Sequence, residues 1–430
     1  MTARRRLAAV AAVAAVALTS SACGTQAPTS ATTNTNQLEV VSWWTSGSEA
    51  AALDVLFAAF HASSPGVHAV NAAVAGGAGS NAIVALAKRL QAGNPPDVWQ
   101  TFNGKSVQGY ASRGVIRGVG SVFDSGDLRA RMNPTILRSV MHGGRPYGVP
   151  TGAHRSNVLW FNTKLLHRAG VSPPSAGYTV AAFLADLQKV KASGATPLCL
   201  GARDRFTTVE LFESTLLSAI GPRGWADMVN DKLNWRGARV RAALKAFGAM
   251  LAYADPQASR LTWDQATKKL AAGGCAFEAM NDSAFGELVA TGAHEGQDFG
   301  AAAFPGTGTS FLAVVDVFVA ATKAPNARNA LAFLAGISRP ATQLAFHKAK
   351  GSVPVLRDVD VSPLTAYQRS SSKAFWASPV LLSIAHGEAM SPEFQEGFYD
   401  AVFSYVRTRS ADAFADDLED AVSKDKLPPR

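Results

Sequence analysis

Two adjacent tryptophans and a nearby glutamate are the side chains whose types and spacing best suit a chemical role. They lie in the segment Trp43-Trp44-Thr-Ser-Gly-Ser-Glu49. A tryptophan ring has an apolar face and a polar edge, so it can stack on the C–H groups of a pyranose ring. A carboxylate such as that of Glu49 accepts hydrogen bonds from pairs of hydroxyls. From composition alone, packing of both tryptophans in a hydrophobic core is an equally good interpretation.

Sequence patterns of common enzymes and cofactor sites are absent. The chain has no Gly-x-Ser-x-Gly elbow, no His-Glu-x-x-His motif and no Walker loop. The glycine-rich stretch 76–79 lacks the Lys and Ser/Thr of a phosphate loop, and we interpret it as a backbone bend. Glu210 and Glu213 have the spacing expected on a helix surface, and the histidines show no metal-ligand spacing. We therefore predict no catalytic residue, no metal, no cofactor and no enzymatic activity.

The elements that position the tryptophans follow a strand–helix alternation. A β-prone strand begins at Leu38 and ends at the tryptophans, and apolar residues then repeat with the helical period between residues 53 and 60. A second strand over 67–74, a further helix and a third strand starting at Val98 come next. Such alternation predicts a parallel α/β layer. In open α/β sheets ligands gather at the carboxyl ends of strands, which is where the tryptophans stand.

Composition and charge exclude several classes of protein. The 430 residues are 47% hydrophobic and 17% charged, which excludes a disordered chain and a polytopic membrane protein. The net charge of +9 is a value that nucleic-acid-binding proteins often have. However, Arg4, Arg5 and Arg6 precede an apolar run over 7–18, which has the pattern of a signal peptide and is too short to span a bilayer. The remaining charge of +6 is dispersed, so no nucleic-acid partner is predicted.

The end of the signal segment, Leu18-Thr-Ser-Ser-Ala22-Cys23-Gly24, resembles a bacterial lipobox. Cleavage before Cys23 would leave this thiol to carry the lipid that anchors the chain to the membrane. Ordinary secretion, with Cys23 as an unpaired thiol, is the alternative. Cys199 and Cys275 lie in apolar, strand-like segments, where they form either a disulfide or two buried free thiols.

A family resemblance extends over nearly the whole mature chain, and an ordered set of short motifs carries it. These motifs are Leu38-Glu-Val-Val-Ser-Trp-Trp, Val74-Ala-Gly-Gly-Ala-Gly, Gly93-Asn-Pro-Pro-Asp97, Tyr147-Gly-Val-Pro, His154-Arg-Ser-Asn-Val-Leu-Trp-Phe-Asn162, Leu211-Phe-Glu-Ser214, Phe304-Pro-Gly-Thr307, Lys350-Gly-Ser-Val-Pro354 and Ala385-His-Gly387. The set resembles extracellular solute-binding protein family 1 of ABC sugar importers, and within it the glucose/mannose-binding subgroup.

The resemblance implies an α/β protein with the two-lobed periplasmic-binding-protein type II fold and a sugar-binding cleft between the lobes. The chain would cross between the lobes near Pro150, Ser310 and Gly351. The implied divisions are a lipoprotein signal peptide (1–22), a lipidated flexible tether (23–37), an N-terminal lobe (38–150 and 311–351) and a C-terminal lobe (151–310 and 352–430).

Eight residues match the family's sugar contacts: Trp43, Trp44, Glu49, Gln100, Trp263, Asp316, Lys350 and His386. Asp316 lies in an apolar strand and needs a partner, which a ligand hydroxyl or Lys350 would supply. Phe102 stands where the family often has a basic or imidazole side chain; it would leave a hydroxyl unpaired and so argues against glucose itself. Asp282 is left out of the set because Ser283 replaces the tryptophan that follows it in the family.

Together these features predict a substrate-binding lipoprotein on the outer face of the cell membrane. It would bind a monosaccharide, glucose- or mannose-like, as a monomer and deliver it to the transmembrane permease subunits of an ABC importer. An oligosaccharide, an amino sugar or a glycerophosphodiester is the alternative ligand, and a secreted carbohydrate-active enzyme or a sensor lipoprotein is the alternative function. We expect Trp44→Ala and Asp316→Ala to lose binding with little loss of stability.

Overall fold

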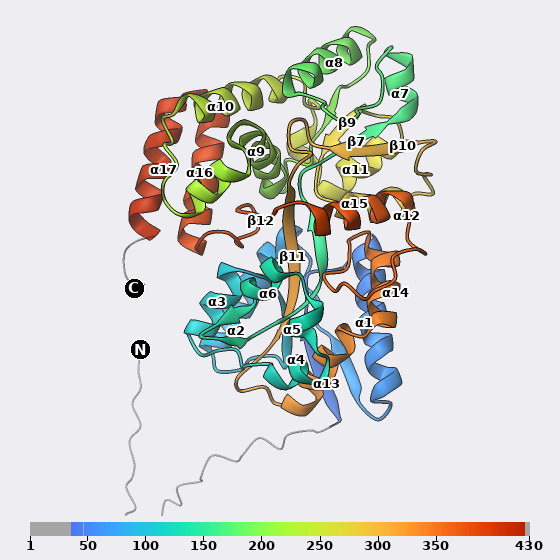
Figure 1. The fold of residues 1–430 in the computed structure, drawn as a ribbon, viewed down its shortest axis with the longest axis vertical. Helices are drawn as coiled ribbons and strands as arrows, with labels where there is room; N and C mark the ends of the chain where they lie inside the picture. Colours follow the sequence, from blue (N-terminus) through green and yellow to red (C-terminus); the bar gives the residue numbers. More distant parts are fainter. Residues whose placement is uncertain (1–35, 46, 426–430) are drawn as a thin grey trace, which may run out of the picture. The chain divides into compact units, whose positions relative to one another are not determined.

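The computed structural model describes residues 36–45 and 47–425. The predicted signal peptide and the lipidation site Cys23 lie outside these residues. In the described part of the chain, no helix is both long enough and apolar enough to cross a membrane. Two sheets, each with its own helices, organise this part (Figure 1).

The first sheet has the strand order β12-β11-β3-β1-β2, and β6 also pairs with β11. Its strands are β1 (Gln37–Val41), β2 (His68–Asn71), β3 (Val98–Phe102), β6 (Val149–Arg155), β11 (Phe311–Ala320) and β12 (Val380–Leu382). The predicted parallel layer is confirmed, because β1 runs parallel to both β2 and β3. The sheet as a whole is mixed, since β11 runs antiparallel to β3 and β6.

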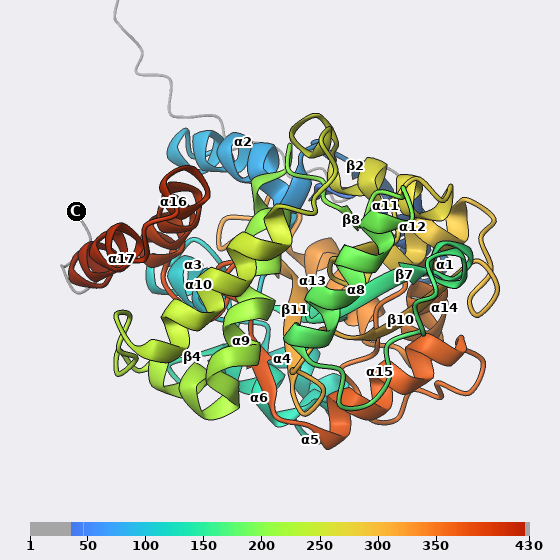
Figure 2. The same cartoon turned by 90° about the horizontal axis from the view of Figure 1, so that it is seen from above.

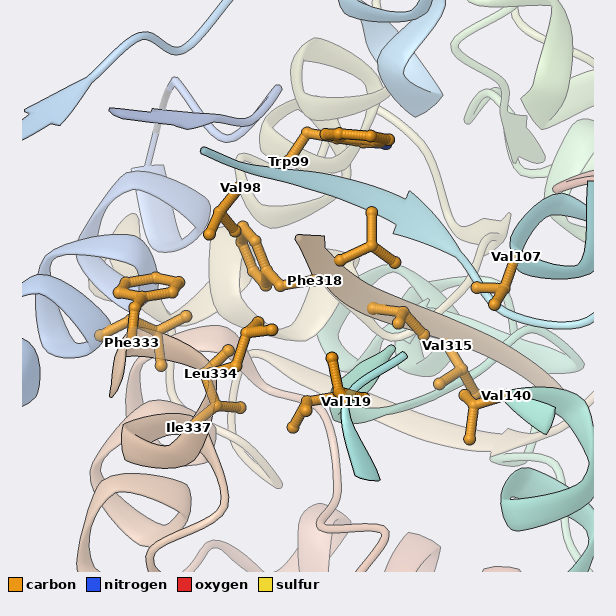
Figure 3. Packing of buried hydrophobic residues seen from close by; sticks show 14 of the residues in the cluster. Val98, Trp99, Val107, Val119, Val140, Val315, Phe318, Phe333, Leu334 and Ile337 are labelled. Atoms are coloured by element: carbon orange, nitrogen blue, oxygen red, sulfur yellow. The ribbon is translucent and has the colours of Figure 1, made fainter. Parts of the chain in front are cut away.

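Helices cover both faces of this sheet, with α1 and α14 on one side of β11 and α2, α3 and α6 on the other (Figure 1). The elements around the first sheet are α1 (Gly47–Ser63), η1 (Gly77–Gly79), α2 (Ser80–Gln91), α3 (Lys105–Ser112), α4 (Gly120–Ser125), α5 (Leu128–Arg131), α6 (Pro134–Ser139), the hairpin β4 (Met141–His142) and β5 (Arg145–Pro146), α13 (Ala327–Ile337) and α14 (Pro340–Lys350). Figure 3 shows Phe333 of α13 facing Phe318 of β11, whose ring centroids lie 5.7 Å apart. Contacts of this kind hold the helices to the sheet.

The second sheet has the order β10-β7-β9-β8, and its strands are β7 (Val158–Asn162), β8 (Leu198–Cys199), β9 (Phe277–Ala279) and β10 (Phe299–Ala303). Its helical elements are α7 (Thr163–Arg168), α8 (Val180–Ala192), α9 (Arg205–Val229), α10 (Ala238–Leu251), η2 (Ala258–Arg260), α11 (Trp263–Ala271), α12 (Ser283–Ala290), α16 (Pro392–Thr408) and α17 (Ala411–Asp425). Helices α16 and α17 pack side by side in both views (Figures 1 and 2). The second sheet and these helices enclose two hydrophobic clusters, one of which lies against α11 and α12.

A disulfide joins Cys199 on β8 to Cys275 just before β9, with the two Cα atoms 5.6 Å apart. Strands β8 and β9 pair in parallel, which brings the two cysteines together across 76 residues of sequence. The sequence left open whether the two cysteines form a disulfide or remain free thiols, and the structure shows the disulfide.

The chain passes from the first sheet to the second between Arg155 and Val158, later than the predicted crossing near Pro150, because β6 stays paired with β11 up to Arg155. It returns between β10 and β11, a segment that includes Ser310. After α14, helix α15 (Ala366–Ala377) contacts both parts of the protein: Phe375 packs in the core of the first sheet, and Tyr367 packs against Trp160 of the second. Strand β12 then pairs with β11 of the first sheet. The exact lobe boundaries given above stay a prediction.

Candidate ligand-binding pocket

One pocket is lined by side chains from the first sheet, from helices packed around both sheets and from the loops between them. Its lining residues are Trp43, Trp44, Glu49, Ala78, Phe102, His154, Phe206, Trp263, Met280, Asn281, Ser283, Val314, Asp316, Lys350 and His386. Seven of the eight predicted site residues belong to this set, although they come from positions as far apart as 43 and 386. The exception is Gln100, which lies behind the pocket wall.

Trp43 and Trp44 follow β1, and both line the pocket and are buried. A role in ligand binding and packing in the hydrophobic core are therefore compatible for these two residues. The ring of Trp43 lies 5.0 Å from that of Phe102. Gly79 allows the backbone to approach Trp43 closely: a Cβ atom at this position, where φ is +76°, would lie 2.6 Å from the indole. The stretch predicted to bend contains the short 3-10 turn Gly77–Gly79, and Ala78 of this turn lines the pocket.

Trp44 is 1% exposed and packs in the hydrophobic core around the first sheet. Its ring contacts those of Phe318 and Phe346, with centroids 5.7 and 5.6 Å away. Truncation of such a side chain leaves a cavity that costs about 3–5 kcal/mol of stability. The expectation that Trp44→Ala spares stability therefore does not hold.

Trp263 enters the pocket from the first residue of α11. Its backbone N–H donates to a carboxylate oxygen of Asp204 at 2.9 Å, and Thr262 with Gln265 forms a capping box at this helix start. The cap fixes the first turn of the helix, and with it the direction from which the indole reaches the pocket.

Lys350 and Glu49 form an ion pair in the pocket wall, with the Lys350 Nζ atom 3.0 Å from Glu49 Oε1. Lys350 Nζ also donates to Ser283 Oγ at 3.1 Å and lies 5.2 Å from the ring centre of Trp44. Burial raises the pKa of Glu49, and Lys350 counteracts this only in part. Lys350 was one predicted partner of Asp316, but its direct partners are Glu49 and Ser283.

Asp316 on β11 accepts a hydrogen bond at 2.7 Å from the Gln100 amide, and its other oxygen lies 3.5 Å from His154 Nε2. Burial alone would raise the pKa of Asp316, but His154, Lys350 and Gln100 together hold it below its usual value. The group is therefore an ionised carboxylate at neutral pH. It offers a charged acceptor on the pocket wall.

Gln100 was predicted to bind a ligand hydroxyl, but both ends of its amide bond to protein groups. Its Oε1 accepts from Ser42 Oγ at 2.6 Å and from the Trp43 N–H at 3.3 Å, while its NH2 group donates to Asp316. These bonds exist because β1, β3 and β11 are neighbours in one sheet. Gln100 thus supports Trp43 and Asp316 from behind.

His154 on β6 lines the pocket and was not among the predicted site residues. Its Nδ1 lies 2.5 Å from Asp282 Oδ1, and Asp282 in turn accepts from the hydroxyl of Tyr367 at 3.1 Å. Burial and Lys350 both lower the pKa of His154, but Asp282 and Asp316 outweigh them and raise it. The motif beginning at His154 was the signal that could have identified it. Its position between two aspartates becomes visible only in the folded chain.

Glu210 and Glu213 on α9 are buried, so their predicted place on a helix surface is wrong. Helix α9 lies among the helices around the second sheet. The loop over 383–388 covers the face of α9 that carries Glu210 and Glu213. Glu210 Oε1 lies 2.7 Å from His386 Nε2, and Glu213 accepts from the backbone N–H groups of Ile384 and Ala385. Burial raises the pKa of Glu213 to about 8.

The remaining wall is apolar and consists largely of Phe102, Phe206, Met280 and Val314. The rings of Phe102 and Phe206 lie 5.0 and 5.5 Å from that of His386. The pocket therefore combines aromatic faces with one carboxylate, one ion pair, two imidazoles, one amide and one hydroxyl group. Such a wall can bind a small ligand that has both C–H faces and hydroxyls.

The pocket is small. About 30 Å³ within it is open to the centre of a water molecule, which is room for a few waters. Helices α1 and α14 of the first half bond directly to α12 of the second, through Ser48 with Glu287 and Lys350 with Ser283. A ligand larger than a few waters therefore requires these two halves to move apart.

Two buried carboxyl groups predict that stability falls as the pH rises above neutrality. Burial raises the pKa of both Glu213 and Glu278 to about 8. An acid with a raised folded pKa holds its proton longer in the folded state, so stability is lost as the pH rises towards that value. His347 has a pKa lowered to about 3 by burial and by the charge of His154, so it affects stability only below about pH 6.5. Between pH 6.5 and 8, each glutamate should cost up to about 2 kcal/mol.

Chemical denaturation across this pH range measures the effect. Glu278→Gln, which keeps a neutral acceptor for Thr267, should make the slope shallower, whereas the exposed Glu393→Gln should leave it unchanged. A flat stability profile in the wild type would contradict the assignment.

Comparison with known protein families identifies the chain. The family model described as "Bacterial extracellular solute-binding protein" matches residues 44–343. The chain belongs to this family. The predicted family is thereby confirmed. This solute-binding protein is also 30% identical, over 96% of its length and 94% of the relative's, to an uncharacterized ABC transporter extracellular-binding protein of Pyrococcus horikoshii.

Two further relatives support the same placement. A probable sugar-binding periplasmic protein of Mesorhizobium japonicum is 28% identical to this solute-binding protein, with 91% of this chain and 94% of the relative covered. Among solved structures, the bacterial solute receptor AcbH, described as having an exclusive preference for β-D-galactopyranose, superposes with a TM-score of 0.78. It is 18% identical, and the comparison covers 91% of this chain and 98% of that one. The two-lobed fold predicted from the sequence is confirmed.

Proposed function

We propose that this protein is the lipid-anchored sugar receptor of an ABC importer. It binds a monosaccharide, or a small sugar like it, in the pocket between the two halves and delivers it to the membrane permease. The observation that carries this proposal is the gathering of three tryptophans with Asp316, Lys350 and His386 around one pocket. Sugar-binding relatives support it, because a relative of nearly equal length is named as a probable sugar-binding protein.

The charges of the pocket wall favour a neutral sugar over a phosphodiester. A phosphodiester is bound best by an unpaired cation, whereas the ionised Asp316 lies on this wall and Lys350 is already paired with Glu49. The proposed membrane anchor is Cys23, and cell fractionation of a Cys23→Ser variant tests it, since loss of the anchor releases the protein from the membrane fraction.

A thermal-shift panel tests the sugar proposal. The panel contains pentoses, hexoses, an amino sugar, an oligosaccharide and a glycerophosphodiester. A ligand at 100 times its Kd stabilises the folded protein by about 2.7 kcal/mol, which gives a visible shift of the transition. We expect one or more neutral monosaccharides to give the largest shift. If no sugar shifts the transition, the proposal is wrong.

Phe102 is expected to determine which hydroxyl pattern the pocket accepts. A hydroxyl facing its ring loses water without gaining a hydrogen bond, so a sugar that lacks this hydroxyl should bind better. Phe102→His supplies a hydrogen-bonding group at the same place. Relative to its deoxy analogue, the affinity for the fully hydroxylated sugar should rise about tenfold.

Isothermal titration of both sugars against wild type and variant measures this ratio. Phe102→Leu is the matched control, because it keeps the wall apolar and should keep the wild-type preference. An unchanged ratio in Phe102→His would exclude a role for Phe102 in specificity.

A further inference from the structure

Two buried glutamates of α9 hold the loop that carries His386. Glu210 and Glu213 lie one helical turn apart and are 1% and 0% exposed. Glu213 Oε2 accepts hydrogen bonds from the N–H groups of Ile384 and Ala385, at 3.1 and 2.7 Å, and from Ser383 Oγ at 3.0 Å. Glu213 therefore fixes the backbone of the loop and does not contact the imidazole of His386.

Glu210 instead bonds to two side chains that line the pocket, although it is not part of the lining itself. Its Oε1 lies 2.7 Å from both His386 Nε2 and Asn281 Nδ2, and its Oε2 accepts from the Asn281 N–H at 3.2 Å. Both carboxylate oxygens thus already accept N–H bonds. Because an acceptor faces His386 Nε2, this nitrogen carries the proton and donates it.

The other ring nitrogen of His386 is buried and has no hydrogen-bond partner in the described part of the chain. The rings of Phe102 and Phe206 flank the imidazole. An N–H at Nδ1 would be buried there without an acceptor. The geometry therefore favours the tautomer with the proton on Nε2 and a free lone pair on Nδ1.

We propose that Glu210 is a positioning residue that fixes His386 in this tautomer, so that Nδ1 accepts a hydrogen bond from a hydroxyl of the ligand. This inference rests on the proposed sugar-binding function and specifies it further. The ligand must place an O–H donor at Nδ1. A deoxy, fluoro or O-methyl group at that position cannot donate, and it leaves the nitrogen buried and unpaired.

The first arm of the test is 15N NMR of the mature protein labelled at histidine, with His386→Gln used to assign the signal. We expect an unprotonated Nδ1 and a protonated Nε2 in the wild type. Glu210→Gln, whose amide can also donate, should change this pattern. Glu213→Gln is the matched control on the same helix, and it should leave the pattern unchanged.

The second arm measures affinities for the best sugar of the thermal panel and for its monodeoxy and monofluoro analogues. In the wild type, one position should show a loss of about tenfold or more when its hydroxyl is replaced. Glu210→Gln should weaken binding of the parent sugar and abolish discrimination at that one position. Thermal unfolding of Glu210→Gln and Glu213→Gln checks that both variants are folded.

A protonated Nδ1 in the wild type would overturn the inference without the need for any variant. An unchanged tautomer in Glu210→Gln, together with unchanged discrimination, would also overturn it. Failure of the wild type to bind any sugar would instead contradict the proposed function, and the NMR arm would still decide the role of Glu210.

Discussion

Asp316→Asn is expected to weaken sugar binding by about 30- to 100-fold, which is the cost of losing one charged hydrogen-bond acceptor in a buried site. Asp316 lines the pocket, and its lowered pKa keeps it ionised at neutral pH. The Asn side chain has almost the same shape and can still accept from Gln100. The fold should therefore survive while the charged acceptor is lost.

Isothermal titration calorimetry with the best sugar of the panel measures this loss, and thermal unfolding of the free protein reports stability. The control is Asp400→Asn, which removes an exposed carboxylate of α16 paired with Arg205 and should not alter binding. Equal affinity in wild type and Asp316→Asn would remove Asp316 from the site.

Loss of the disulfide between Cys199 and Cys275 is expected to lower the stability of the folded protein markedly. The bond closes a loop of 76 residues, and the entropy of that loop in the unfolded chain corresponds to about 2–4 kcal/mol. For domains of this size, 1 kcal/mol changes the melting temperature by about 2–4 °C. The double variant Cys199→Ser/Cys275→Ser should therefore melt about 5–15 °C lower.

Differential scanning calorimetry, with and without reducing agent, measures this difference. A reductant should lower the melting temperature of the wild type and leave that of the double variant unchanged. An unaltered wild-type melting temperature, with both thiols shown by alkylation to be free after reduction, would contradict a stabilising role.

The sequence was sufficient to predict the fold class and about half of the residues that line the pocket. Periodicity located α1 through its apolar residues, and strand–helix alternation predicted the parallel part of the first sheet. The site residues could be named because short motifs in a fixed order pointed to a family, and not because spacing alone brings Trp43 near His386. Those contacts are made by the fold.

The features that could not be predicted depend on the hydrogen-bond and packing partners that the fold brings to each side chain from distant parts of the sequence. Gln100 was expected to contact ligand, but the neighbouring strands take both ends of its amide. Glu210 and Glu213 have the spacing of a solvated helix face, and only the loop over 383–388 makes that face an interior one. His154 begins a sequence motif, but its partners could not be identified from the sequence. Asp282 and Asp316 approach it from distant parts of the chain.

A crystal structure of the protein in complex with the sugar that gives the largest thermal shift tests the central claim most directly. We expect the sugar ring to lie in this pocket, stacked on one or more of Trp43, Trp44 and Trp263, with hydroxyls bonded to Asp316 and Lys350. A sugar bound elsewhere, contacting none of these residues, would contradict the account.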